Sequence, residues 1–352
     1  MVLIVEPGTK YTKICSFEKN GKALYSTFKA DDLNEKNLQK KISHSFKNAA
    51  ISAIAFRVLF GADYFSAPVP IDGRFFKKFE RLTDLFPFYI PHAARMLDIF
   101  YKNFKNIPLI AFFETSFFTK LAKEESYYAI PYEYHKSNRI KKFGFHGIFH
   151  EAASGLFPKN KKIISVVLDK QTTVCSIDKG TPSTISLGYT PLEGIMSRTS
   201  CGDLDPGIVF YLIDKAKYSL FKIDEILKND SGFKGFTGYD LSFEEFAKLY
   251  GHDSRVNLAF EIYQSQILKY IGEGIAIMGG IDAIIFSGGF LGAIQAFIYN
   301  LTKKISFLGI NLKELPWGSQ KELLKISSPG SGIETWLNYR SIEKTILLSL
   351  TY

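Results

Sequence analysis

The chain has 352 residues, of which 46% are hydrophobic and 22% are charged. This length predicts about two domains of roughly 100–200 residues each, and the composition excludes a disordered or fibrous chain. The net charge of +9 fits either an electropositive site for a polyanion or a general lysine bias. Because the lysines are spread along the whole chain, the second interpretation is favoured and a nucleic-acid partner is not expected.

The ends and the cysteines indicate the cellular setting. The first residues lead directly into Glu6 and Pro7, without the apolar run of a signal peptide, and no apolar stretch reaches the ~18–20 residues of a membrane helix. The three cysteines, Cys15, Cys175 and Cys201, are widely spaced and odd in number. We therefore expect reduced thiols in a cytoplasmic protein with no membrane partner, rather than a disulfide framework or a metal cluster.

The first half of the chain predicts a hairpin followed by alternating elements. Residues 2–5 and 12–17 form two short apolar runs around a polar tip, which is typical of a hairpin. Residues 53–60 predict a buried strand, residues 90–104 carry a helical period, and residues 108–113 predict another strand.

The second half opens in the same way. Residues 163–168 predict a strand and residues 173–177 its hairpin partner. Residues 255–278 predict a long amphipathic helix, and a strand at 284–286 runs into Gly288-Gly289. Strands alternate with helices while hairpins recur, so we expect an α/β protein with mixed sheets.

One polar loop carries most of the functional information. Residues 188–206 read GYTPLEGIMSRTSCGDLDP, a composition that breaks regular structure and exposes backbone N–H groups. This loop resembles the acetate kinase signature T-P-L-E-G-L-x-x-x-T-R-S-G-D-[IL]-D-P. Three further segments resemble the same family in the same order: residues 128–134 (YAIPYEY), residues 143–150 (FGFHGIFH) and residues 269–283.

The resemblance implies a fold, a reaction and partners. It implies the two-domain actin-like ATPase (ribonuclease H-like) fold, with mixed sheets and a nucleotide cleft between the domains. Residues 1–120 plus 336–352 would form the N-terminal domain, and residues 121–335 the C-terminal domain with the nucleotide site and the dimer interface. The implied reaction converts ATP and a short carboxylate such as acetate into an acyl phosphate and ADP with Mg²⁺, in a homodimer.

The resemblance also assigns residues to the reaction. Arg57 matches the arginine that binds the carboxylate, since a guanidinium offers it a bidentate fork. His146 matches the histidine that contacts the transferred phosphoryl group. Glu114 aligns with a catalytic aspartate, and its extra methylene could shift the carboxylate by about 1 Å. Ser200 replaces a catalytic arginine, which leaves Arg198 as the nearby cation.

Further residues would bind metal, nucleotide and substrate. Glu334 matches a glutamate that helps to hold Mg²⁺, although a solvated glutamate at a helix start explains it equally well. Glu6 stands at an asparagine of the first phosphate loop, where it could bind Mg²⁺ more strongly than an amide but would repel an unmetallated phosphate. The nucleotide site would comprise Lys170, Gly288, Gly289 and Gly292. The substrate pocket would be lined by Leu59, Phe88, Phe145 and Pro191, and its bulky members favour acetate or formate over butyrate.

Several departures gather where the family handles phosphate. Besides Ser200, Glu6 replaces an asparagine, and Tyr89 replaces a histidine, with His92 one helical turn on as a substitute. The loop at residues 169–171 (DKQ) has lost a histidine and the glycines that let a backbone approach phosphates closely. Three hypotheses follow: a carboxylate kinase, a catalytically impaired homologue that binds nucleotide or regulates, and a related kinase with another substrate.

Overall fold

The computed structural model describes residues 1–18, 21–47, 49–313 and 321–350. The chain divides into two compact units, one formed by Met1–Thr119 with Ile342–Tyr352 and the other by Lys120–Ser341. The predicted domain boundary at 335/336 falls inside a strand, Glu334–Asn338, and the chain enters the first unit again at Ile342.

The first unit is built on a six-stranded mixed sheet in the order β3-β2-β1-β4-β6-β5. An antiparallel meander, β1 to β3, is followed by β4 and β6, which run parallel to β1, and by β5 at the edge. The strands are β1 Val2–Pro7, β2 Tyr11–Phe17, β3 Ala23–Lys29, β4 Ala53–Val58, β5 Val69–Pro70 and β6 Leu109–Phe113.

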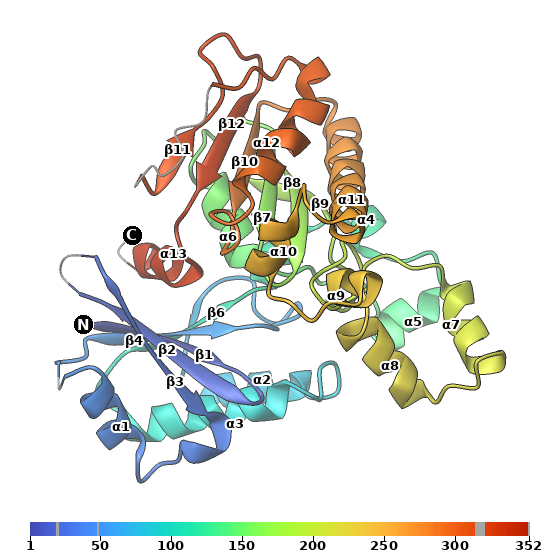
Figure 1. Cartoon of the computed structure of the whole chain (residues 1–352). Helices are drawn as coiled ribbons and strands as arrows, with labels where there is room; N and C mark the ends of the chain where they lie inside the picture. The colour runs from blue at the N-terminus through green and yellow to red at the C-terminus, as the bar shows by residue number, and fades with distance from the viewer. Residues whose placement is uncertain (19–20, 48, 314–320, 351–352) are drawn as a thin grey trace. The chain divides into compact units, whose positions relative to one another are not determined.

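Helices cover both faces of this sheet. They are α1 Leu38–Ser45, α2 Gly73–Phe79, α3 Ile90–Asn103 and α13 Ile342–Ser349, with short 3₁₀ turns at Ala30–Asp32, Glu80–Leu82 and Ser116–Lys120. In α3, Ile90, Ala93, Leu97 and Phe100 recur at helical spacing and are buried, so one face of the helix packs on the sheet. Figure 1 shows α3 and α13 on opposite faces.

The second unit repeats this topology. Its sheet has the order β11-β12-β10-β7-β8-β9, again with a three-stranded antiparallel meander followed by two parallel strands and an antiparallel edge strand. The strands are β7 Ile163–Leu168, β8 Thr172–Asp178, β9 Thr181–Ile185, β10 Ala283–Ser287, β11 Leu323–Lys325 and β12 Glu334–Asn338. Every residue of β7 and β10 is buried, as expected for parallel strands covered on both faces.

The helices of the second unit are organised around α11. They are α4 Lys123–Ser126, α5 Tyr132–Ser137, α6 Gly147–Ser154, α7 Pro206–Asp214, α8 Leu220–Asn229, α9 Gly232–Thr237, α10 Phe243–Leu249, α11 Ser254–Met278 and α12 Gln295–Lys304, with a 3₁₀ turn at Ser306–Leu308. Asp253 caps α11, and Gly279 ends it in the left-handed conformation. Gly274 lets α11 approach β8, because a Cβ there would overlap the Ser176 hydroxyl.

The main predictions from the sequence are confirmed. The hairpins at 2–17 and 163–177 are paired strands, and the helices expected at 90–104 and 255–278 are α3 and α11. The strand expected at 53–60 ends at Val58. The third strand of each meander, β3 and β9, was not predicted, nor were β12 and the helices α7 to α10.

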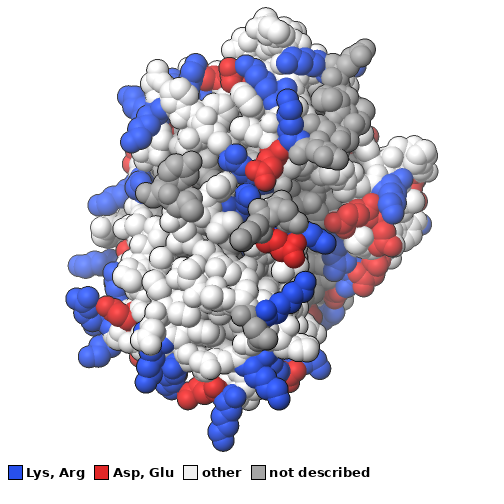
Figure 2. Space-filling model, turned by 90° about the vertical axis from the view of Figure 1, so that its left-hand side faces the viewer, with Lys and Arg blue, Asp and Glu red and all other residues white. Residues whose placement is uncertain are grey.

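The charged side chains and the longest helices bear on the sequence-based expectations for nucleic-acid and membrane partners. On the face drawn in Figure 2, lysine and arginine side chains are scattered among uncharged surface rather than gathered in one patch. Among the described residues, none of the helices has the length and apolar character needed to cross a bilayer.

Candidate active site

Arg57 lies between two carboxylates at one edge of the first sheet. Its strand β4 is flanked by the parallel strands β1 and β6, which bring Glu6 and Glu114 to the same carboxyl ends. The Arg57 Nε–H donates to Glu114 Oε1 over 2.5 Å, and Nη1 donates to Glu6 Oε2 over 3.2 Å. Ligands of open α/β sheets bind outside the carboxyl ends of strands, so this triad occupies a favourable place.

The exposures of the triad differ from one carboxylate to the other. The side chain of Glu114 is 1% exposed and that of Arg57 12%, whereas Glu6 is 33% exposed. A buried carboxylate needs a partner, so the guanidinium is required by Glu114. The bond from Arg57 to Glu6 is longer, and Glu6 is more exposed to water. An incoming anion can therefore replace Glu6 at a lower free-energy cost than Glu114.

The triad also bears on the metal ion implied by the family. Two carboxylates and one guanidinium leave an excess negative charge at the sheet edge, and carboxylate oxygens are the ligands that Mg²⁺ prefers. The described residues hold no group of three or more His, Cys, Asp or Glu side chains arranged for a metal ion. Mg²⁺ commonly takes only one or two carboxylates plus water and phosphate, so Glu6 and Glu114 fit that ion.

Tyr89 lies near the triad and contacts Leu59, one of the predicted pocket residues of the first unit. The backbone N–H of Leu59, two residues after Arg57, donates to the Tyr89 hydroxyl over 3.1 Å. Burial, followed by the nearby Glu6 carboxylate, raises the pKa of Tyr89 well above its usual value. Phe88 is 81% exposed, and His92 on α3 is exposed as well.

His146 is held by a chain of hydrogen bonds within the second unit. It precedes α6 in a left-handed conformation, with φ 60° and ψ 24°, an uncommon state for a residue with a side chain. Its Nδ1 lies 3.1 Å from Thr173 Oγ1, which also lies 2.9 Å from Nε2 of His150. The other His150 nitrogen bonds Ser165 Oγ, and burial keeps the pKa of His150 well below its usual value.

The signature loop is closed at its base by two reciprocal hydrogen bonds. Asp203 Oδ1 accepts from the N–H of Gly194 over 2.7 Å, and the Asp203 N–H donates to the Gly194 carbonyl. Tyr270 on α11 donates to Asp203 Oδ2. These bonds hold the TPLEG and GDLDP segments side by side in the folded loop.

A second clamp joins the signature loop to another family segment. Tyr128 of the YAIPYEY segment donates its hydroxyl proton to Glu193 and accepts from the N–H of Tyr189. Gly188 leaves room for this pair, because a Cβ there would overlap the Glu193 carboxylate and the Tyr128 hydroxyl in their present positions. Burial raises the pKa of Glu193, although the Tyr128 bond and Lys142 oppose this shift.

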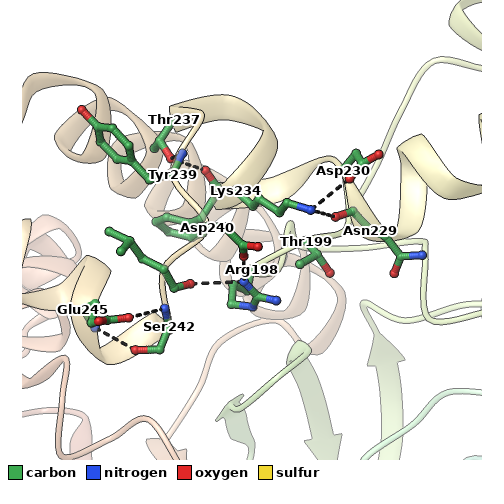
Figure 3. Close-up of polar contacts among 12 residues, drawn as sticks. Arg198, Thr199, Asn229, Asp230, Lys234, Thr237, Tyr239, Asp240, Ser242 and Glu245 are labelled. Atoms are coloured by element: carbon green, nitrogen blue, oxygen red, sulfur yellow. Dashed lines mark hydrogen bonds and ion pairs between the residues drawn. The ribbon is translucent and has the colours of Figure 1, made fainter.

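Arg198 contacts the connection between α9 and α10. Its Nη1 donates to Asp240 Oδ1 over 2.8 Å and to the Leu241 carbonyl over 3.2 Å, as Figure 3 shows. Both side chains of this ion pair are exposed. The described contacts of Arg198 therefore lie with the α9–α10 connection rather than with residues 169–171.

Ser200 contacts the glycine-free loop directly. The Gln171 amide nitrogen lies 3.3 Å from Ser200 Oγ, and Ser200 Oγ lies 2.7 Å from Ser197 Oγ. Ser200 is buried. Two departures from the family pattern are thus neighbours in space, and sequence reasoning did not single out Gln171 as a side chain with a partner.

The predicted nucleotide residues lie partly together. Gly288 adopts φ 108°, and a Cβ there would lie 2.3 Å from the Leu168 carbonyl oxygen, so this close approach requires glycine. The N–H of Phe290 donates to the same carbonyl, which brings Gly288-Gly289 beside Asp169. The side chain of Lys170 is exposed, and Gly292 has neither a left-handed φ nor a crowded Cβ position.

Glu334 lies at the other end of the second sheet. It pairs with Ala283 at the start of β10, whereas the Gly288 turn follows Ser287 at the end of that strand, roughly 13 Å away at the rise of a β-strand. Glu334 bonds Lys325 over 2.7 Å and accepts from the Trp336 indole over 2.9 Å. The structure therefore does not bring Glu334 to the Gly288 turn.

The remaining pocket residues belong to the second unit. Phe145 is buried and Pro191 half-buried. Because Leu59 and Phe88 belong to the other unit, the substrate pocket stays a prediction.

The architecture defines the class of protein. Two six-stranded sheets of the same topology form the two-domain actin-like ATPase fold. The structure of acetate kinase from Porphyromonas gingivalis superposes with a TM-score of 0.89 at 23% identity, covering 99% of this chain and 98% of that one. A propionate kinase from Francisella tularensis gives a TM-score of 0.85 at 23% identity, covering 98% and 97%.

Sequence comparisons specify the family. The model of the acetokinase family matches residues 2–334. The acetate kinase of Dictyoglomus thermophilum is 32% identical over 297 residues, which are 82% of this chain and 74% of the relative. That of Halothermothrix orenii is 32% identical over 290 residues, covering 80% and 73%. The chain belongs to the acetokinase family.

Proposed function

We propose that the protein is a carboxylate kinase that transfers the γ-phosphoryl group of ATP to acetate, giving acetyl phosphate and ADP. The observation that carries this proposal is the Glu6–Arg57–Glu114 triad at the carboxyl ends of three parallel strands. The relatives named acetate kinase support the choice of reaction and substrate.

Arg57 binds the carboxylate of the substrate. A guanidinium presents a planar fork that matches a carboxylate in a bidentate arrangement. Glu114 keeps the guanidinium oriented from its buried side, while the substrate replaces the longer bond to Glu6. Substrate binding thus exchanges one carboxylate partner of Arg57 for another and leaves no buried charge unpaired.

Glu6 and Glu114 would hold Mg²⁺, which supplies positive charge to the phosphates of ATP when it is bound. His146 contacts the transferred phosphoryl group, and Thr173 with the buried His150 fixes the orientation of its ring. Gly288 and Gly289 bind the nucleotide beside Leu168 and Asp169, with the exposed Lys170 as the nearby cation. Glu334, Gly292 and Arg198 have no part in this proposal.

The protein forms a homodimer in the cytoplasm through its second unit. Helix α7 is almost wholly apolar and buries none of its residues, and Phe210, Leu220 and Phe221 are exposed on α7 and α8. An exposed apolar surface of this kind is typical of an interface.

One observation favours a second candidate function. Ser200 and Gln171 form a neutral pair where the family places an arginine and a glycine-rich loop. Loss of one such charge-stabilising donor typically lowers kcat by about 10²–10³-fold. The alternative is therefore a homologue that binds nucleotide and acts as a regulatory protein.

Hydroxamate trapping of acyl phosphate separates these functions. The purified protein is incubated with acetate, ATP and Mg²⁺, and Arg57→Ala serves as the control. The kinase proposal predicts product from the wild-type protein and none above background from the variant. Absence of product with ATP binding in calorimetry would favour the regulatory function, and absence of both would contradict the two candidates.

A further inference from the structure

Through its hydroxyl group, Tyr89 accepts one hydrogen bond within the fold but donates none among the described residues. Its side chain is 96% buried in the first unit, at the residue before α3 begins. The hydroxyl oxygen accepts from the N–H of Leu59, and among the described residues its proton has no acceptor. Buried hydroxyl groups normally satisfy both roles, so an unused donor here calls for an explanation.

The position of this donor relates it to the triad. Leu59, whose backbone N–H bonds the hydroxyl, directly follows the end of β4 and lies two residues after Arg57. The hydroxyl lies within electrostatic reach of Glu6, Arg57 and Glu114, which are the charged groups that act on it. The donor therefore lies at the same end of β4 as the guanidinium that binds an anion.

We propose that the Tyr89 hydroxyl donates a hydrogen bond to an oxygen of the anion bound by Arg57. This inference rests on the proposed carboxylate site and assigns it one more ligand-contacting residue. In this arrangement Tyr89 helps orient the anion, and the ligand enters past Glu6, the most exposed member of the triad.

The tyrosine has a consequence that a histidine at this position would not have. Burial holds the pKa of Tyr89 far above physiological pH, so the hydroxyl keeps its proton throughout the working range of the protein. A histidine would gain or lose a proton near pH ~6.5. Anion binding by the wild-type protein should therefore be free of any titration at position 89.

The test is calorimetric titration of the full chain with acetate and, separately, with inorganic phosphate. Tyr89→Phe keeps the ring and removes the donor, so the affinity for the bound anion should fall about tenfold. Tyr101→Phe, on the same helix but exposed at its far end, should leave the affinity unchanged. Arg57→Ala should abolish binding.

The two anions separate this inference from the proposed function. If phosphate binds and acetate does not, the carboxylate kinase proposal is wrong, and Tyr89 is tested on phosphate alone. If the affinity of folded Tyr89→Phe matches that of the wild-type protein, or if neither anion binds, the inference is overturned.

Tyr89→His covers the case in which Tyr89→Phe does not fold, since imidazole can both accept from Leu59 and donate. Its affinity for acetate, which stays ionised in this range, should increase at least threefold as the pH falls through ~6.5, while the wild-type affinity for acetate stays constant. A pH profile of the variant that parallels the wild-type profile would exclude contact between residue 89 and the anion.

Discussion

The two sheets share one topology but differ in the chemistry at the carboxyl ends of their parallel strands. In the first unit, these ends carry the charged triad of Glu6, Arg57 and Glu114. In the second unit, the corresponding hairpin turn carries Gln171, whose side chain contacts the neutral Ser200. The first end carries ion pairs around a guanidinium, whereas the second carries the neutral Gln171–Ser200 contact next to the charged Asp169 and Lys170.

This difference indicates which step is limited. In the proposed function the carboxylate binds to the first unit, where Arg57 pairs with the buried Glu114 and the more exposed Glu6. Stabilisation of the transferred phosphoryl group depends on cations near the equatorial oxygens, and Arg198 is bound to Asp240 instead. We therefore expect a protein that binds acetate normally and transfers phosphate slowly.

The largest effect should come from removing the centre of the triad. Arg57→Ala leaves the carboxylate of Glu114 buried without its guanidinium, which should cost about 3–5 kcal/mol of the free energy of unfolding. Activity should fall by about 10³-fold, since the carboxylate loses its bidentate partner. Urea unfolding and steady-state kinetics measure the two losses.

Arg74→Ala is the matched control for this variant. Arg74 pairs with Asp72 in the same unit but is almost fully exposed, so its removal should leave the stability nearly unchanged. Equal losses in the two variants would show that the triad is an ordinary surface ion pair.

The next largest effect should come from restoring charge to the second unit. Ser200→Arg should raise the rate of acetyl phosphate formation by about 10-fold to 100-fold, because one stabilising cation is regained. The contact of Ser200 with Gln171 predicts a larger gain when Gln171→Gly is added, since the amide then no longer occupies the space. Thr199→Arg places the same charge one residue away and should give no gain.

A smaller effect should follow from adding a side chain at Gly288, where the turn lies close to the Leu168 carbonyl. Gly288→Ala forces a side chain into φ 108° and against the Leu168 carbonyl, which should cost about 1–3 kcal/mol of stability. ATP affinity, measured by calorimetry, should fall in the variant. Gly292→Ala is the control, because its Cβ would meet no atom within 4 Å, and equal behaviour of the two would contradict this role of Gly288.

The smallest effect should be a dependence of stability on pH through Glu193. Its pKa is raised in the folded state by burial, so the folded chain binds more protons than the unfolded chain above the ordinary pKa of a glutamate. The free energy of unfolding should therefore fall as the pH rises from about 4.5 towards the raised value. Glu193→Gln should flatten this slope in urea titrations, and an unchanged slope would assign it to other groups.

The sequence predicted the positions of the triad residues better than the contacts of Gln171, Ser200 and Arg198 in the second unit. Arg57 and Glu114 lie in or directly after strands with clear apolar runs, so their strand ends could be placed from the pattern alone. The contact of Gln171 with Ser200 and the contact of Arg198 with Asp240 depend on loop conformations, which no periodic pattern encodes. The position of Glu334 depends on the register of β12, a strand that the sequence analysis did not identify.

The kinetic constants of Ser200→Arg test the central comparison most directly. If carboxylate binding is intact and phosphoryl transfer is limited, kcat should rise while the KM for acetate stays within about twofold of the wild-type value. A variant in which the KM for acetate falls and kcat does not change would contradict the account, because the limitation would then lie in the carboxylate site of the first unit.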